Sequence, residues 1–280
     1  MTAPDRYAVF GQPINHSKSP RIHALFAAQT GQNLSYTAQE VGPAEFDQTV
    51  TDFFAAGGKG LNCTVPLKEL AFRLADRLTP RAQRAKAVNT LWRDAEHGLS
   101  GDNTDGLGLI ADLTVNHGLA LGGQRLLLLG AGGASRGVIA PLLEHQPAQL
   151  LIANRTVDKA AAIAAEFADL GAIAACGYPD LTGRQFDLII NATSASLGQK
   201  LPPLPSGLLA AGGACYDMAY AKLATPFVTW GQAQAARLSL DGIGMLVEQA
   251  AAAFEIWRGV RPDSRAVIAL LNQERGGAAS

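Results

Sequence analysis

Short runs of β-branched residues and leucine alternate with alanine-rich segments of helical period along nearly the whole chain. In its first part, the apolar runs predict strands at residues 7–10, 34–40, 61–65 and 88–92. The segments between them predict helices at residues 20–30, 43–55 and 67–76. This alternation is typical of α/β proteins, in which crossover helices join parallel strands.

A second alternating series follows a glycine-rich stretch at residues 98–108. An amphipathic segment at 107–116 leads into it, and its apolar runs predict strands at 125–129, 150–153, 186–191 and 214–218. Turn-forming residues at 101–105 predict a hinge there, and a chain of 280 residues is long enough for two domains. The last clear helix is predicted at 243–257 and could pack against either domain.

Composition narrows the class of protein. The chain is 48% hydrophobic and 17% charged, which predicts a globular protein with a sizeable core. Lys and Arg total 23 against 24 for Asp and Glu, so nucleic acid and membrane surfaces are not expected partners. No apolar run approaches the ~20 residues of a membrane span, and the N-terminus shows no secretory signal. The three cysteines lie far apart, which argues against a disulfide framework or a metal site and favours the cytoplasm.

A glycine loop between a predicted strand and a predicted helix indicates a dinucleotide site. Gly130 would permit the tight turn, and Gly132 would let the backbone approach a pyrophosphate at the start of the helix. Ser135 occupies the third glycine position and is small enough for the helix to pack on the strand. The predicted cofactor loop consists of Gly130, Ala131, Gly132, Gly133, Ala134 and Ser135.

The next strand ends in Asn154-Arg155-Thr156, roughly 20 residues on, where the ribose-reading residue belongs. A carboxylate there would accept from a free 2′-hydroxyl, whereas the guanidinium of Arg155 would pair with a 2′-phosphate. Lys159 could add a second positive charge. The alternative is that Arg155 and Lys159 are solvated surface charges and that Thr156 only caps a helix. The site predicts NADP rather than NAD.

Four polar residues of the first half lie at helix starts and strand ends, where open sheets bind ligands. Ser19 precedes Pro20 and could be only an N-cap, whereas Ser17 has no such role and is the better ligand candidate. Asn62 and Thr64 alternate with apolar residues and should share one face of a strand. Ligand contact is favoured for both over internal hydrogen bonding.

Lys68 stands near the start of a helix, where the helix dipole opposes a cation. Such a position suits a group that exchanges a proton, but a surface lysine is the commoner outcome. Asp105 precedes another helix and could be its cap, and Asp102 is an equally good cap, so the sequence cannot rank the two. Asn89 interrupts an apolar strand as Asn62 does.

Together these segments resemble the shikimate dehydrogenase family over essentially the whole chain. The matching segments are GQPINHSKSPRIH at 11–23, GGKGLNCTVPLKE at 57–69, AVNT at 87–90, GDNTDG at 101–106, GAGGASRG at 130–137, NRT at 154–156, NATS at 191–194, YDMAY at 216–220 and DGIGMLVEQAA at 241–251. NCTVPLK and NTDG are the most specific, and all follow in the order of the family.

The resemblance implies a Rossmann-like NADP-binding domain at 105–241, inserted into an α/β substrate domain at 1–104 that the C-terminal helices at 242–280 rejoin. Lys68 and Asp105 match the family's catalytic pair. Its substrate-binding positions match Ser17, Ser19, Asn62, Thr64, Asn89, Tyr220 and Gln249. Further cofactor contacts are implied at Thr193, Met218 and Gly242. Helical period alone would have left Gln249 as an exposed glutamine.

The implied reaction is the reversible reduction of 3-dehydroshikimate to shikimate with NADPH, in the pathway to chorismate and the aromatic amino acids. Lys68 would give a proton or stabilise the developing alkoxide, and Asp105 would hold a substrate hydroxyl; which of them moves the proton stays open. One alternative is a quinate or broad shikimate/quinate dehydrogenase, against which Arg155 argues because that enzyme typically prefers NAD. Another is a non-catalytic NADPH-binding sensor. The chain could be a monomer or a homodimer.

Overall fold

The structure is a computed structural model that describes residues 3–94, 96, 98–193 and 195–276. Contacts divide the chain into two compact units. The first unit comprises Met1–Gly108 and Val247–Val267, and the second comprises Leu109–Leu246 and Ile268–Ser280. Asp105 thus groups with the first unit, while the domain boundaries expected from the sequence stay predictions.

The first unit contains a six-stranded sheet in the order β2-β1-β3-β5-β6-β4. Its strands are β1 (Asp5–Gly11), β2 (Leu34–Glu40), β3 (Gly58–Cys63), β4 (Arg77–Leu78), β5 (Thr90–Asp94) and β6 (Gly98–Asp102). β1 runs parallel to β2 and β3, but β5 runs antiparallel to both β3 and β6. This sheet is therefore mixed, and β5 runs antiparallel to β6 because the short link between them cannot hold the dozen or more residues of a crossover.

The helices of the first unit cover this sheet. They are α1 (Ser19–Thr30), α2 (Phe46–Ala55), α3 (Lys68–Leu74), α4 (Pro80–Ala85), the start of α5 (Asp105–Ile110) and most of α9 (Ile243–Arg258). α1 begins next to Pro20 and ends at Gly31, whose φ of 65° suits a residue without a side chain. Phe10, Phe46 and Leu61 are fully buried in the core between the sheet and these helices.

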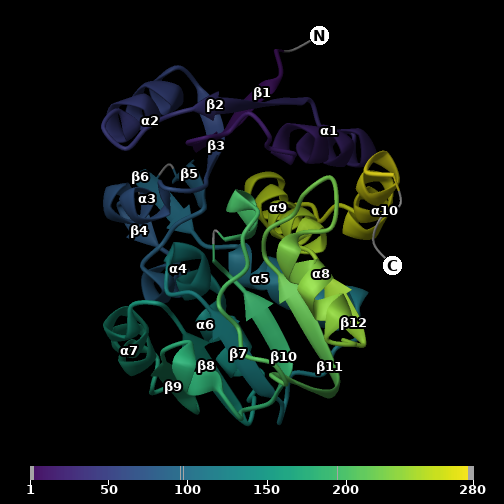
Figure 1. Ribbon diagram of the computed structural model, residues 1–280. Helices are drawn as coiled ribbons and strands as arrows, with labels where there is room; N and C mark the ends of the chain where they lie inside the picture. Colours follow the sequence, from purple (N-terminus) through teal and green to yellow (C-terminus); the bar gives the residue numbers. More distant parts are fainter. Residues whose placement is uncertain (1–2, 95, 97, 194, 277–280) are drawn as a thin grey trace. The chain divides into compact units, whose positions relative to one another are not determined.

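The second unit contains a fully parallel sheet in the order β12-β11-β10-β7-β8-β9. Its strands are β7 (Arg125–Leu129), β8 (Gln149–Ala153), β9 (Ile173–Cys176), β10 (Phe186–Asn191), β11 (Leu209–Asp217) and β12 (Leu238–Leu240), and Figure 1 shows them side by side. Numbered within the unit, the order is that of the doubly wound Rossmann fold, which confirms the predicted fold class. The strand order reverses between β7 and β10, where such sheets bind ligands.

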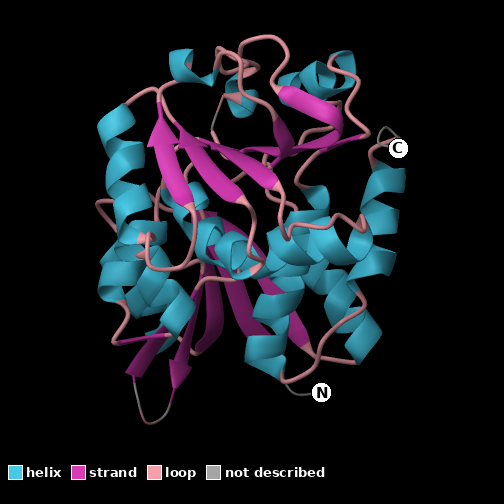
Figure 2. Ribbon diagram, turned by 90° about the horizontal axis from the view of Figure 1, so that it is seen from below, coloured by secondary structure: helices cyan, strands magenta, loops and turns pink. Residues whose placement is uncertain are grey.

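Helices cover both faces of the second sheet. They are α6 (Gly133–Glu144), α7 (Val157–Glu166) and α8 (Pro226–Ala233), with the later part of α10 (Ser264–Glu274) and two 3-10 turns, η2 (Pro179–Leu181) and η3 (Ser196–Gly198). Figure 2 shows the helices of the protein (cyan) alongside its strands (magenta). Alternate leucines of β7 point to opposite faces, so Leu126 and Leu128 join one core cluster and Leu127 and Leu129 the other.

The amphipathic segment predicted at 107–116 forms the later part of α5 and a following π-helix, η1 (Ala111–Asn116). β6 includes Gly101 and Asp102, the first two residues of the hinge predicted at 101–105. Glycine suits position 101 of this strand, because a Cβ there would lie 3.0 Å from the side chains of Ala75 and Val88. The turn chemistry of the glycines therefore concealed a buried strand.

The three cysteines are buried, as small apolar residues usually are. Burial raises the pKa of each thiol above its ordinary value, to about 12 for Cys215. All three are free, and the described residues contain no cluster that could hold a metal ion. No helix in the described part of the chain is both long and apolar enough to cross a membrane.

A buried imidazole lies between α1 and the sheet of the first unit. The ring of His23 stacks on Tyr36 with centroids 4.0 Å apart and planes 4° apart, and Phe254 and Trp257 flank it. Neither ring nitrogen has a hydrogen-bond partner among the described residues. Burial therefore lowers the pKa of His23 from 6.5 to about 3.

Because His23 is buried in its neutral form, we expect the free energy of unfolding to fall at acid pH. The unfolded chain protonates His23 with its ordinary pKa of 6.5, whereas the folded protein resists protonation down to about 3. Its contribution to stability is therefore complete above pH 6.5 and is lost as the pH falls toward 3. At pH 5 the loss should be about 2 kcal/mol. His23→Phe, which keeps an aromatic ring, should remove this part of the pH dependence in urea unfolding at pH 7 and pH 5. An unchanged pH dependence would contradict the assignment.

Candidate active site

The structure brings Lys68 and Asp105 together within the first unit. Lys68 is the first residue of α3, and Asp105 is the first residue of α5. Lys68 Nζ donates to Asp105 Oδ2 across 2.5 Å, with side chains 16% and 7% exposed. The pair is thus largely withdrawn from water. A charge-assisted hydrogen bond is stronger in such a buried environment than in water.

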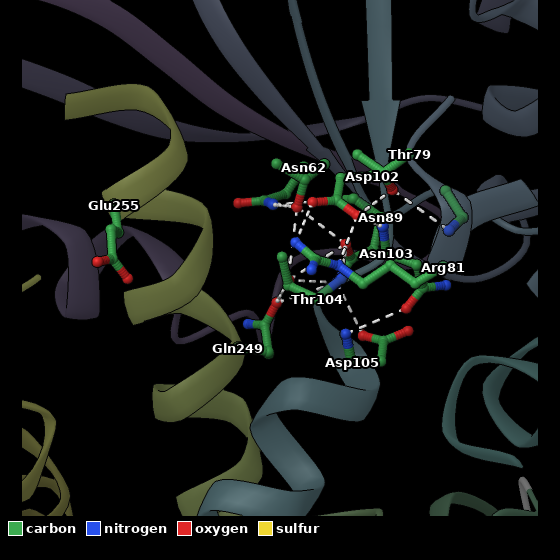
Figure 3. Close-up of polar contacts among 12 residues, drawn as sticks. Asn62, Thr79, Arg81, Asn89, Asp102, Asn103, Thr104, Asp105, Gln249 and Glu255 are labelled. Atoms are coloured by element: carbon green, nitrogen blue, oxygen red, sulfur yellow. Dashed lines mark hydrogen bonds and ion pairs between the residues drawn. The ribbon is translucent and has the colours of Figure 1, made fainter. Parts of the chain in front are cut away.

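Asn89 holds the other oxygen of the Asp105 carboxylate. Its Nδ2 donates to Asp105 Oδ1 at 2.9 Å and lies 3.2 Å from the side-chain oxygen of Gln249 (Figure 3). The backbone N–H of Thr104 donates to Asn89 Oδ1 at 2.9 Å. Because a backbone N–H can only donate, this contact fixes which end of the amide faces Asp105.

Asp102, which the sequence could not distinguish from Asp105, is a structural residue. Its side chain is 1% exposed and accepts bonds from Arg81, from Thr79 at 2.5 Å and from the N–H of Asn103 at 2.7 Å. The start of α5 is capped instead by Asn103, whose Oδ1 accepts from the N–H of Asp105 at 3.1 Å. The interpretation of Asp105 as a helix cap was therefore wrong. Its carboxylate instead accepts hydrogen bonds from Lys68 and Asn89.

Asn62 lies at the end of β3, and its amide is engaged on both sides. Its Oδ1 accepts from the hydroxyl of Tyr36 at 2.6 Å, and its Nδ2 lies 2.9 Å from Asn89 O and 3.1 Å from Thr90 Oγ1. Internal hydrogen bonding, which the sequence analysis ranked second, is thus present at Asn62. Thr64 follows β3 and is half-buried. Contact of either residue with a ligand stays a prediction.

The two serines at the start of α1 differ from the local expectation, because Ser19 belongs to the helix and does not occupy its N-cap position. Ser17 Oγ lies 3.3 Å from the N–H of Ser19, which is the first residue of the helix and is buried. Lys18 occupies the N-cap position and makes no side-chain capping bond. The expectation that Ser17 has no cap-like role was therefore wrong, because the helix begins one residue before Pro20.

Gln249 and Tyr220 are the predicted substrate positions that come late in the sequence. Gln249 lies on α9 and turns its side-chain oxygen toward Asn89, whereas Glu255 on the same helix lies apart from the cluster (Figure 3). Tyr220 follows β11 in the second unit and is half-buried. No local signal in the sequence identifies Gln249, because only tertiary packing places it beside Asn89.

The glycine loop of the second unit has the geometry that a bound pyrophosphate requires. Gly130 has a φ of 106°, a conformation that L side chains rarely adopt, and a Cβ at Gly132 would meet no atom within 4 Å. The backbone at Gly132 is therefore open to a close approach at the start of α6. Ser135 is fully buried, and its hydroxyl donates to Gly130 O at 2.9 Å, which ties the turn to the helix.

Arg155 and Lys159 are both exposed in the second unit, after β8 and in the first turn of α7. Arg155 lines a hollow of about 760 Å³ together with Tyr178, Pro179 and Leu204. Thr156 occupies the N-cap position of α7, but its side chain makes no capping bond, contrary to expectation. Asn154 Nδ2 instead donates to Thr156 O at 2.8 Å.

The remaining predicted cofactor positions lie at or after the ends of neighbouring strands of the second unit. Thr193 follows β10 and donates to Asn191 Oδ1 at 2.7 Å, and Met218 follows β11. A Cβ at Gly242 would lie 2.3 Å from Met218 O, so only glycine fits there. These positions and the glycine loop follow the carboxyl ends of β7, β10, β11 and β12, on the side where doubly wound sheets bind nucleotides.

The polar network around Asn89 contains three residues that were not predicted from the sequence: Tyr36, Thr90 and Thr104. Thr90 Oγ1 donates to Asn89 Oδ1 at 2.8 Å and is fully buried. Thr104 Oγ1 lies 3.0 Å from Asn89 Nδ2. Their proximity in sequence to Asn89 and Asp105 was the only signal available for Thr90 and Thr104, and Tyr36 had none.

Comparisons with known proteins agree with this geometry. Residues 9–91 match the family model for the shikimate dehydrogenase substrate binding domain, 112–198 that for shikimate / quinate 5-dehydrogenase, and 242–271 that for the shikimate 5′-dehydrogenase C-terminal domain. Shikimate dehydrogenase (NADP(+)) of Methylococcus capsulatus is 62% identical over 275 residues, covering 98% of this chain and 99% of the relative.

Solved structures show the same likeness. An Ael1 enzyme from Pseudomonas putida matches with a TM-score of 0.88 and 49% identity over 95% of this chain and 98% of that one. Shikimate 5-dehydrogenase from Thermus thermophilus, solved with NADP(H) and shikimate, matches with a TM-score of 0.85 and 33% identity over 96% of this chain and 99% of that one. The fold, the matched domains and the identities together show that this chain belongs to the shikimate dehydrogenase family.

Proposed function

We propose that this protein catalyses the reversible NADPH-dependent reduction of 3-dehydroshikimate to shikimate, a step toward chorismate and the aromatic amino acids. The observation that carries the proposal is the Lys68–Asp105 pair, joined at 2.5 Å and held by Asn89. A relative that is 62% identical over 98% of the chain is named shikimate dehydrogenase (NADP(+)), which supports the proposal.

Lys68 and Asp105 act together on the proton of the reaction. Lys68 Nζ faces the substrate oxygen that gains a proton in reduction, and its positive charge stabilises the charge that develops there. Asp105 holds Lys68 in place with one oxygen and accepts from Asn89 with the other.

Hydroxyl and amide side chains of the first unit bind the substrate. Shikimate carries several hydroxyls and a carboxylate, which require a site rich in polar groups. We assign its binding to Ser17, Ser19, Asn62, Thr64, Asn89 and Gln249. Tyr220 of the second unit stays a predicted substrate contact. Burial of several of these groups makes the site intolerant of a ligand that lacks the matching hydroxyls.

We assign NADP binding to the second unit. The open space around the backbone of Gly132 supports this assignment, because a pyrophosphate must approach the backbone closely there. The loop from Gly130 to Ser135 binds the pyrophosphate at the start of α6. Asn154, Arg155, Thr156 and Lys159 surround the adenosine end, and Thr193, Met218 and Gly242 contribute from the neighbouring strand ends. When bound, NADPH supplies the hydride that reduces the ring carbonyl.

We place the protein in the cytoplasm, as a monomer or a homodimer. Its three buried free thiols fit a reducing compartment. Light scattering of the purified protein distinguishes the two oligomeric states.

The proposed activity is tested by following absorbance at 340 nm with shikimate and NADP, and then with quinate and NAD. We expect turnover with the first pair to exceed turnover with the second. Equal or faster turnover with quinate and NAD would instead favour the broad shikimate/quinate dehydrogenase, an option that the description of the family model at 112–198 includes. Absence of turnover with either pair at any pH would favour a non-catalytic NADPH-binding sensor.

Lys68→Met should lower turnover by roughly 10²–10⁴-fold, because it removes the proton donor and the charge but keeps a long side chain. The matched control is Lys59→Met, which changes an exposed lysine on β3 of the same unit and should leave turnover within about twofold. Steady-state kinetics with saturating shikimate and NADP measure both. Turnover of Lys68→Met within about tenfold of the unmodified enzyme would exclude the assigned role.

Arg155→Ala should raise KM for NADPH far more than KM for NADH, because the guanidinium pairs with a phosphate that only NADPH carries. A loss of roughly tenfold or more is expected for a charge-assisted contact of this kind. Arg184→Ala removes another exposed arginine of the second unit and serves as the control. Equal effects of Arg155→Ala on both cofactors would show that Arg155 is only a surface charge.

A further inference from the structure

Tyr36 on β2 of the first unit has a buried hydroxyl that the catalytic assignments leave unused. This hydroxyl lies 2.6 Å from Asn62 Oδ1, and its oxygen also has a hydrogen bond with Ser19. Burial raises the pKa of Tyr36 well above its ordinary value, so the phenol stays protonated and able to donate. One face of its ring stacks on His23 with planes 4° apart, which limits rotation of the ring.

The hydrogen bonds around Asn62 have one consistent direction. Asn62 Nδ2 lies 2.9 Å from the carbonyl oxygen of Asn89, which can only accept, so the amide nitrogen must face that oxygen. Asn62 Oδ1 then faces Tyr36, and Tyr36 must donate to it. The tyrosine hydroxyl therefore stabilises one of the two possible orientations of the Asn62 amide.

The same direction continues from Asn62 to the carboxylate of Asp105. Asn62 Nδ2 donates to Thr90 Oγ1 at 3.1 Å, so the Thr90 hydroxyl is directed to Asn89 Oδ1 at 2.8 Å. Asn89 then donates to Asp105 Oδ1 at 2.9 Å. A continuous chain of donors thus runs from Tyr36 through two amides and one hydroxyl to the carboxylate that binds Lys68. Chains of this kind strengthen their members in a buried environment.

We propose that Tyr36 is a positioning residue for the reaction, and that its hydroxyl, acting through Asn62 and Thr90, helps to hold Asn89 in the orientation toward Asp105 and the substrate that the N–H of Thr104 also favours. The inference rests on the proposed function, because Asn89 and Asp105 are assigned there to bind the substrate. It goes beyond the proposed function because it gives a role to Tyr36, which contacts Asn62 and forms no hydrogen bond with Asp105 or Lys68 among those described. His23 contributes by holding the ring of Tyr36 flat against it.

Tyr36→Phe tests the proposal, because it removes the hydroxyl and keeps the stacked ring. We expect KM for shikimate to rise about tenfold, the equivalent of one neutral hydrogen bond, while KM for NADP stays within about twofold. The matched control is Tyr7→Phe, which removes another buried tyrosine hydroxyl of the first unit, one that Arg258 contacts at 3.2 Å outside the chain of donors. Its KM for shikimate should stay within about twofold of the unmodified enzyme.

A double-mutant cycle with Thr90→Val tests the route. This second change interrupts the chain but leaves Asn62 its bond to Asn89 O, and Asn89 its bond to the N–H of Thr104. If Tyr36 acts through Thr90, the double variant should raise KM for shikimate no further than the larger single effect. If Tyr36→Phe fails to fold, an unchanged KM for shikimate in Thr90→Val would still overturn the proposal, because the proposed route passes through Thr90.

Three results would overturn the proposal: an unchanged KM for shikimate in Tyr36→Phe, an equal rise in KM for NADP, or effects that multiply in the double variant. Turnover of the unmodified enzyme with shikimate and NADP is measured first. Its absence would refute the proposed function, whereas normal turnover with an unaffected Tyr36→Phe would refute only this inference.

Discussion

Buried hydrogen-bonding groups must find partners inside a protein, and in the first unit this requirement centres on the amide of Asn89. Its oxygen faces the N–H of Thr104 and the hydroxyl of Thr90, so its nitrogen is left for Asp105. That nitrogen and Lys68 together hold both oxygens of the carboxylate. If the Asn89 amide were rotated by 180°, its nitrogen would face the N–H of Thr104 and its oxygen would face the carboxylate of Asp105. Both contacts would be unfavourable, so the neighbours of Asn89 hold the amide in one orientation.

Much of the fold could be predicted from apolar periodicity. Three strands, β2, β7 and β10, have the bounds that the sequence indicates, because turn residues or glycine border each of these runs. β4 and β12 have only two and three residues, too few to show a period. β6 was concealed by glycines whose purpose is close packing, as Gly101 shows. The apolar periodicity of a sequence indicates which side chains are buried. It does not identify a strand that is very short, or one in which glycines allow the backbone to pack closely on side chains.

The candidate site was predictable in its parts but not in its connections. Lys68, Asn89 and Asp105 could be selected from position and from the family motifs. The choice between Asp102 and Asp105 required the side chain of Arg81, which arrives from another element and neutralises Asp102. Tyr36 lies in a strand that alternates without any unusual feature, so only its distance to Asn62 identifies it. Tertiary contacts decide such roles, and local sequence carries no record of them.

The order in which the chain is synthesised bears on the first unit, since residues 247–267 belong to it. Trp257 fills the space over Gly60, where a Cβ would lie 2.5 Å from its ring. Arg258 bonds Gln32 and lies 2.5 Å from Asp5. A growing polypeptide therefore exposes part of the sheet around β1 and β3 until these late residues emerge from the ribosome. The first unit begins the chain, but it cannot complete its fold in the cell until residues 247–267 have been synthesised.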